Sequence, residues 1–120
     1  MMGLKQLPPA IRRKQRYIIF QIHSEKEFEI GKVVNAVWDG LYRFLGEKGV
    51  SEADPWIMKS LFDRKKQVGG IKTGRDHVSD IRTALTLIES IDSEKVCINS
   101  IGVSGTMESA REKFISQEDQ

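Results

Sequence analysis

Cysteine and histidine are scarce in this sequence, which contains one cysteine, Cys97, and two histidines, His23 and His77. A single cysteine cannot form an intrachain disulfide, and the chain has too few such ligands for a metal cage. The spacing ties neither histidine to a serine or cysteine nucleophile, so no catalytic triad can be assembled. Cys97 stands in an apolar segment and is predicted to be a small buried side chain, which suits a reducing cytosol.

Long hydrophobic runs are also absent. No apolar stretch approaches the roughly 20 residues that a membrane-spanning helix needs. Residues 1–14 contain no hydrophobic core of signal-peptide length, so we expect a cytoplasmic protein with no membrane partner. The glycines at 69, 70 and 74 lack the spacing of a phosphate-cradling loop before a helix. We therefore expect a chain that is not catalytic by itself.

Charge is segregated along the chain, although the formal net charge is only +2. Residues 1–24 carry five Lys and Arg and no acid, and residues 64–82 carry six Lys and Arg against two acids. The segments 25–63 and 83–120 are acidic and offset them. Fixed positive clusters on a small fold favour contact with the phosphates of a nucleic acid. Solvated surface charge is the alternative for each cluster.

A length of 120 residues predicts a single domain over residues 1–120. Residues 1–14 are expected to form a basic flexible arm, and residues 116–120 a polar tail. Gly46 and Gly49 are expected to end the first helix. The predicted elements are a strand over 17–23, a helix over 27–47, a hairpin of strands 58–62 and 68–73, a helix from an Asp76 N-cap to residue 91, a strand over 95–103 and a helix from Thr106.

This β-α-β-β-α-β-α order predicts an α+β fold. It is the split β-α-β plan, ferredoxin-like or RNA-recognition-module-like. In this plan helices pack on an antiparallel four-stranded sheet, here with an extra C-terminal helix. Many unrelated functions share the plan, so it does not decide what the protein does.

Aromatic residues are few where the plan would use them for RNA. Base stacking on the open sheet face would need aromatic side chains on the two central strands. Only Tyr17 is predicted to lie on that face, and Trp38 and Trp56 are expected to pack in the core or at an edge. This pattern favours recognition of an RNA backbone by Lys and Arg, or coverage of the face by a partner protein or by the last helix.

Four segments of the sequence carry a resemblance: RRKQRYIIFQI, NAVWDGLYRFLGEKGVSEAD, GGIKTGRDHVSDIRTALTLI and VSGTMESAREKF. In this order they resemble ribonuclease P protein component 2 of archaea, the counterpart of the eukaryotic Pop-five subunit that ribonucleases P and MRP share. The resemblance spans roughly residues 12 to 114. It includes the basic start of the first strand, Gly46 at the exit of the first helix, and the VSGT turn.

The resemblance implies a protein subunit of ribonuclease P, the endoribonuclease that removes the 5′ leader from precursor tRNA. It implies that catalysis lies in the RNA with its bound magnesium, and that the protein holds no cofactor or metal of its own. The implied partners are the ribonuclease P RNA, precursor tRNA and a subunit of the Rpp-thirty type. The basic positions expected to bind RNA are Arg12, Arg13, Lys14, Arg16, Lys72 and Arg75, joined by His77 from the same cluster; none is expected to be catalytic.

Two other functions stay open. One is a protein-docking subunit of a ribonucleoprotein with little direct RNA contact, whose partner complex would form without RNA and would not depend on salt. The other is a small-molecule-binding regulatory domain, which would need a defined apolar pocket. The contacted nucleotides, the docking surface and self-association stay open as well. An exposed apolar sheet face would favour self-association.

Overall fold

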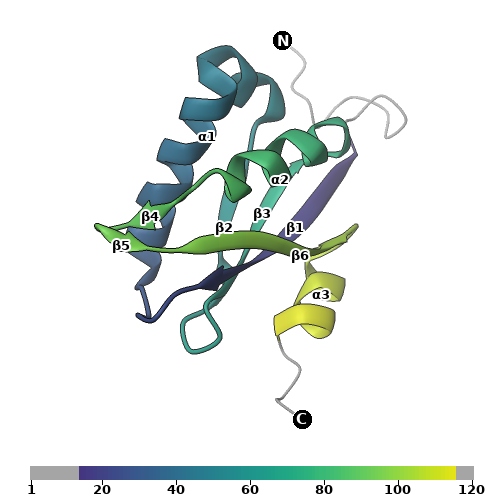
Figure 1. Ribbon diagram of the computed structural model, residues 1–120. Helices are drawn as coiled ribbons and strands as arrows, with labels where there is room; N and C mark the ends of the chain where they lie inside the picture. Colours follow the sequence, from purple (N-terminus) through teal and green to yellow (C-terminus); the bar gives the residue numbers. More distant parts are fainter. Residues whose placement is uncertain (1–13, 116–120) are drawn as a thin grey trace.

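A computed structural model describes residues 14–115 of the chain (Figure 1). Four strands form an antiparallel sheet in the order β2-β3-β1-β6. Helices lie on both faces of this sheet, so the predicted α+β fold is confirmed. The predicted polar tail, and all of the predicted arm except Lys14, lie outside the described residues. The strands are β1 Gln15–His23, β2 Trp56–Asp63, β3 Val68–Gly74 and β6 Cys97–Ser104.

Strand β1 is the centre of the molecule. It pairs with β3 on one side and with β6 on the other, and Ile18, Ile19 and Phe20 have no exposed surface. Ile18 and Phe20 belong to the larger core, beneath two helices, whereas Ile19 belongs to a smaller cluster on the opposite face. An uninterrupted apolar run in a strand is typical of burial on both faces.

Two helices cover one face of the sheet. Helix α1 (Ile30–Ala53) buries Val33, Val37 and Leu41, and helix α2 (Val78–Thr86) buries Ile81 and Leu85. The buried residues of each helix recur every three or four positions, which gives each helix one apolar face. None of the helices within residues 14–115 is both long and apolar enough to cross a membrane.

The C-terminal segment packs on the opposite face. Figure 1 shows α3 (Met107–Ala110) on the side of the sheet away from α1 and α2, and a π turn, η3 (Arg111–Ile115), continues it. Ala110 joins Ile19, Leu61 and Val68 in the smaller core, with Phe114 packed against them. The last helix therefore covers part of the sheet face opposite α1 and α2, for which RNA, a partner protein or this helix was expected from the sequence.

Several element ends differ from the prediction. The predicted stop at Gly46 is confirmed as a break, because Gly46 has φ 71° and ψ 176° and interrupts α1. A second helical segment, which the prediction lacked and which contains Gly49, follows to Ala53. Helix α2 ends at Thr86, because Ile91 belongs to a two-stranded ribbon of β4 (Ser90–Ile91) and β5 (Glu94–Lys95). The predicted Asp76 cap is wrong: residues 75–77 form a 3-10 turn, η2, and no side chain caps α2.

The predicted burial of Cys97 is also wrong. Its side chain is exposed, whereas its neighbours Val96 and Ile98 are buried. Cys97 is the first residue of β6 and pairs with exposed His23 at the end of β1. Side chains of a strand alternate between its two sides, and the apolar context of Cys97 comes from neighbours that point the other way.

The β2–β3 hairpin is fastened by a buried glutamine. The Gln67 side chain accepts a hydrogen bond from the Phe28 amide (3.0 Å) and donates to the Phe28 carbonyl (3.0 Å) and the Arg64 carbonyl (2.6 Å). Gln67 is 6 % exposed. One amide side chain therefore satisfies three backbone groups and joins the hairpin to the segment that leads into α1.

We predict that Gln67→Met destabilises the protein by about 2–4 kcal/mol, since it leaves buried backbone groups unpaired at about 1–3 kcal/mol each. Urea unfolding followed by circular dichroism measures the loss. Gln15→Met makes the same change at an exposed position and should stay within about 0.5 kcal/mol of the unmodified protein. Equal stability of the two variants would contradict the role of Gln67.

Candidate functional site

Part of each basic segment comes together where β1 begins and β3 ends. Arg64, Lys65 and Lys66 of the second segment lie in the β2–β3 turn, at the other end of β3. Gln15 pairs with Gly74, and the Arg75 amide donates a hydrogen bond to the Lys14 carbonyl at 2.8 Å. Two segments far apart in the sequence therefore meet at one end of the sheet. We call Lys14, Arg16, Lys72 and Arg75 the basic end.

The basic end presents charge on both faces of the sheet. Arg16 pairs with Thr73, whose hydroxyl donates to the Ala53 carbonyl at the end of α1, so Arg16 lies on the α1–α2 face. Lys72 pairs with Tyr17, which packs in the smaller core, so Lys72 lies on the α3 face. Lys14 and Arg75 are exposed at the edge between these faces.

The ion pairs leave most of this charge uncompensated. Arg75 lies 3.7 Å from Asp76, with both side chains more than half exposed, which is a weak pair. Among residues 14–115, none of the ion pairs with a carboxylate involves Lys14, Arg16 or Lys72. The basic end therefore has cations available to an external anion.

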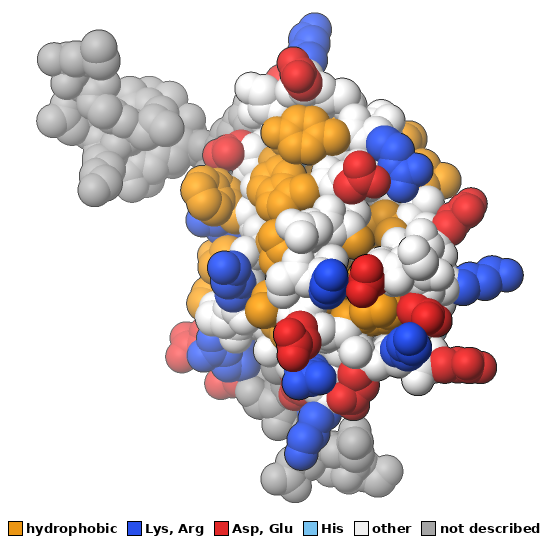
Figure 2. Space-filling model, turned by 90° about the vertical axis from the view of Figure 1, so that its left-hand side faces the viewer, with side chains coloured by type: hydrophobic (Ala, Val, Ile, Leu, Met, Phe, Trp, Pro, Cys, Tyr) orange, Lys and Arg blue, Asp and Glu red, His pale blue; other side chains and the backbone are white. Residues whose placement is uncertain are grey.

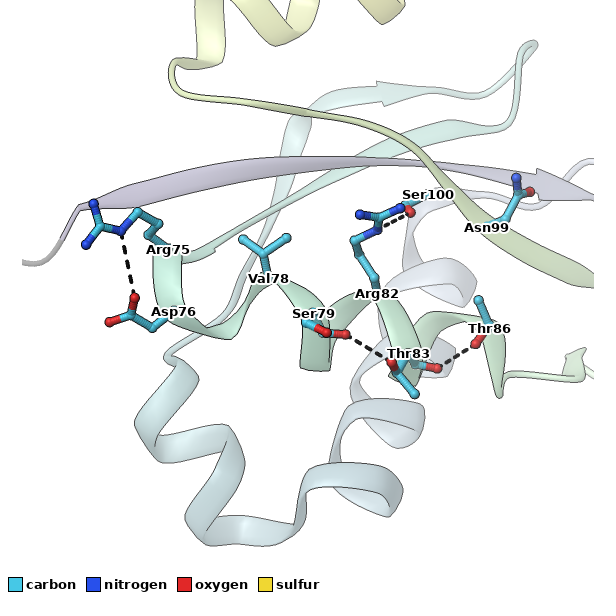
Figure 3. A pocket seen from close by; sticks show the side chains of 9 residues that line it. All are labelled: Arg75, Asp76, Val78, Ser79, Arg82, Thr83, Thr86, Asn99 and Ser100. Carbon is cyan, nitrogen blue, oxygen red and sulfur yellow. Dashed lines mark hydrogen bonds and ion pairs between the residues drawn. The ribbon is translucent and has the colours of Figure 1, made fainter.

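A groove adjoins the basic end along α2. It has a volume of about 670 Å³ and runs between α2 and β6, beginning at η2 (Figure 3). Most of its lining residues are polar, with two arginines, one aspartate and several hydroxyl groups. The lining residues are Arg75, Asp76, Val78, Ser79, Arg82, Thr83, Thr86, Asn99 and Ser100.

Arg82 crosses this groove from α2 to β6. Figure 3 shows its guanidinium directed at Ser100, and its Nε donates to the Ser100 Oγ at 2.8 Å. The remaining guanidinium nitrogens still have donors to offer, because a guanidinium carries five N–H groups. Together with Arg75 at the mouth, Arg82 gives the groove the composition of a phosphate-binding surface.

Of the residues predicted from the sequence, the structure brings Lys14, Arg16, Lys72 and Arg75 together at one end. Arg12 and Arg13 lie outside the described residues. His77 is half-buried in η2 and does not line the groove. The prediction omitted Arg82 and the hydroxyls of α2. Their signal was the spacing of Arg75, Ser79, Arg82, Thr83 and Thr86, which places them on one helical face.

The α1 side of the molecule contrasts with the basic end. Figure 2 shows Lys and Arg interspersed with Asp and Glu there, below a group of apolar side chains. Arg43 pairs with Asp39 at 3.2 Å and Lys48 with Glu52 at 3.9 Å, so the charge on this helix is largely balanced. A polyanion would find more net positive charge at the basic end.

The described residues hold no arrangement suited to acid–base or metal chemistry. No group of three His, Cys, Asp or Glu within residues 14–115 could hold a metal ion. The hydrogen bond from Lys26 to Glu94, and the charge of that carboxylate, raise the pKa of Lys26. This pair lies near the opposite end of the sheet, beside β5. Within residues 14–115 the basic end and the groove carry the positive charge and the hydrogen-bond donors that suit an anion.

Comparison with known proteins identifies the family. The model of the Rpp14/Pop5 family, a ribonuclease P family, matches residues 16–115. The chain belongs to this family. The match begins at Arg16 and includes nearly all of the strands and helices described above, so most of the basic end and the whole groove lie within it.

Archaeal relatives extend the match to nearly the full chain. The ribonuclease P protein component 2 of Pyrococcus furiosus is 42% identical over 113 residues, which cover 94% of this chain and 92% of that protein. The proteins of the same name from Thermococcus kodakarensis and Methanocaldococcus jannaschii are 40% and 37% identical, over 94% and 93% of this chain and 92% and 81% of theirs.

A solved structure has the same fold. One chain in the cryo-EM structure of yeast ribonuclease MRP superposes with a TM-score of 0.62, over 79% of this chain and 76% of that chain. The identity is 12%, so this likeness concerns the fold alone. It agrees with the split β-α-β plan that the strand order shows.

We predict that Arg75→Ala and Arg82→Ala change the free energy of unfolding by no more than about 1 kcal/mol each. Their polar contacts are exposed, and exposed ion pairs and hydrogen bonds contribute little to stability. Urea unfolding tests this. A decrease above about 2 kcal/mol would mean that the two arginines serve the fold and are not free for a ligand.

Proposed function

We propose that this chain is a protein subunit of ribonuclease P that binds the catalytic RNA through its basic end and α2 groove. In this role it supports the magnesium-dependent removal of the 5′ leader from precursor tRNA in the cytoplasm. The observation that supports this most is the 42% identity, over nearly the whole chain, to a ribonuclease P protein component 2. The cations clustered at the basic end, which have few carboxylate partners within residues 14–115, supply the chemistry that such a role needs.

The proposed mechanism is electrostatic. Fixed Lys and Arg replace the cations that condense on RNA, so that a compact RNA forms with less magnesium. The chain positions these charges on a rigid sheet end, because Arg16 and Lys72 project from paired strands in the centre of the sheet. Catalysis in this proposal belongs to the RNA and its bound magnesium, and the protein contributes no acid, base or nucleophile.

A protein partner of the Rpp-thirty type belongs to the same proposal. Helix α1 exposes apolar side chains that nothing in the described residues covers, among them Tyr42 and Phe44, which are 48% and 43% exposed. The Trp38 and Tyr42 rings lie together, with centroids 5.9 Å apart. Exposed aromatic groups are typical of surfaces that bind proteins. RNA and protein would then occupy different sides of the chain.

The alternative of a protein-docking subunit with little RNA contact draws on the same apolar side chains of α1. It leaves the charge at the basic end without a role. The small-molecule alternative finds less support, since the α2 groove is polar and open and carries two arginines.

We predict that the combined change Arg12→Ala, Arg13→Ala and Arg16→Ala weakens binding of the ribonuclease P RNA. It should also flatten the dependence of log affinity on log salt by about 2, because each phosphate that is no longer bound lowers the slope by about 0.7–0.9. Filter binding across a salt series measures both quantities.

The matched control removes the same charge from α1 through Lys32→Ala, Arg43→Ala and Lys48→Ala. These three side chains are exposed and face carboxylates. The control variant should keep most of the original salt slope. An unchanged slope in the first variant, or an equal fall in both, would contradict specific RNA contacts at the start of β1.

We predict that the protein, added with its partner subunit to the ribonuclease P RNA, lowers the magnesium concentration needed for precursor-tRNA cleavage. The variant Arg75→Ala, Arg82→Ala should need more magnesium and recover at high magnesium, since added cations can replace the positive charge that was removed. Cleavage rates over a magnesium titration provide the measurement. A magnesium requirement that the protein does not alter would contradict the mechanism.

A further inference from the structure

A row of side chains from three paired strands lies at the basic end of the sheet, on the face away from α1 and α2. Lys72 of β3 pairs with Trp56 of β2 on one side and with Tyr17 of β1 on the other. Side chains of directly paired residues point to the same face, so a cation stands between two aromatic rings. Neighbouring strands lie about 4.8 Å apart, which separates the two aromatic positions by roughly 10 Å.

The face is open at this row. Trp56 is 56% exposed, and Lys72 and Tyr17 are half-buried. The C-terminal segment reaches β2 further along, where Arg111 donates to the Ser60 carbonyl at 3.3 Å and the Ser60 hydroxyl contacts the Met107 sulfur at 3.9 Å. Met107 of α3 therefore bounds the open area, and Trp56 stays uncovered among the described residues.

The fold does not account for this tryptophan. Trp56 belongs to neither cluster of packed apolar residues, whereas the next residues of β2, Ile57 and Met58, each pack against one of them. Trp56 also departs from the packing role expected from the sequence. A large ring held on a rigid strand beside a lysine, at the basic end, has the composition of a stacking platform for single-stranded RNA.

Resting on the proposed function, we propose that Trp56, Lys72 and Tyr17 form a subsite for an unpaired nucleotide of the bound RNA. A nucleobase stacks on the Trp56 ring, Lys72 contacts the adjoining phosphate, and Tyr17 borders the subsite next to α3. Protein docking at the same row fits the chemistry less well, because lysine is depleted in the cores of protein interfaces. The subsite gives the chain contact with bases as well as with the RNA backbone.

Tryptophan fluorescence tests the subsite directly. The chain has two tryptophans, so Trp38→Phe leaves Trp56 as the only reporter. The probes are single-stranded hexaadenylate, single-stranded hexauridylate and a short RNA hairpin whose only unpaired bases are those of its loop. We expect hexaadenylate to quench Trp56 most, because a purine offers the larger stacking surface, and the hairpin to quench it least.

Affinity measurements separate stacking from charge. Trp56→Ala should weaken hexaadenylate binding about tenfold with an unchanged salt slope, and Trp56→Phe should retain most of the affinity. Lys72→Gln should lower the salt slope by about 0.7, as expected for one contact to single-stranded RNA. Leu87→Ala removes another large side chain that is 54% exposed, and it should change neither quantity.

The outcomes are distinct. Absence of quenching together with full affinity of Trp56→Ala would overturn the subsite, while retained binding of the ribonuclease P RNA would leave the proposed function intact. If the unmodified protein bound neither hexaadenylate nor the ribonuclease P RNA, both the subsite and the proposed function would be overturned. If Trp56→Ala weakened association with the partner protein but not with RNA, the row would be a protein-docking surface and the subsite would be wrong.

Discussion

Burial of β1 on both faces is the constraint on which the rest of the structure depends. Ile18 and Phe20 require cover on one face and Ile19 requires it on the other, so the α1–α2 layer alone cannot complete the core. The C-terminal segment supplies the second cover. Because that cover is short, the α3 face stays open at the basic end, where the pairing of β1 with β3 places Lys72. The same pairing places Arg16 at this end on the α1–α2 face.

Periodicity and turn residues were sufficient to predict the four strands of the main sheet, helices α1 and α2, and their order. They were insufficient to predict the secondary structure or the burial of a residue whose local pattern fits two different positions in the fold. Ile91 continues the helical spacing of α2 but is buried in a short ribbon instead, and Cys97 lies between buried neighbours while facing solvent. Such outcomes depend on tertiary packing, which a local pattern does not contain.

The candidate site was predictable in part, because charge clusters can be counted along a chain. Lys14, Arg16, Lys72 and Arg75 were expected to bind RNA, and the pairing of β1 with β3 places them together. Arg82 and Trp56 were harder to predict. The role of Arg82 depends on the packing of α2 beside β6, and the exposure of Trp56 depends on how much of the sheet α3 covers.

Lysine reactivity in the assembled ribonucleoprotein tests the central claim, that the RNA lies against the basic end, most directly. Brief acylation followed by mass spectrometry compares each lysine in the free protein and in the complex with RNA alone. We expect protection of Lys14 and Lys72, with Lys32 and Lys48 on α1 as reactive as before. Protection of the α1 lysines, with Lys14 and Lys72 still reactive, would contradict this placement of the RNA.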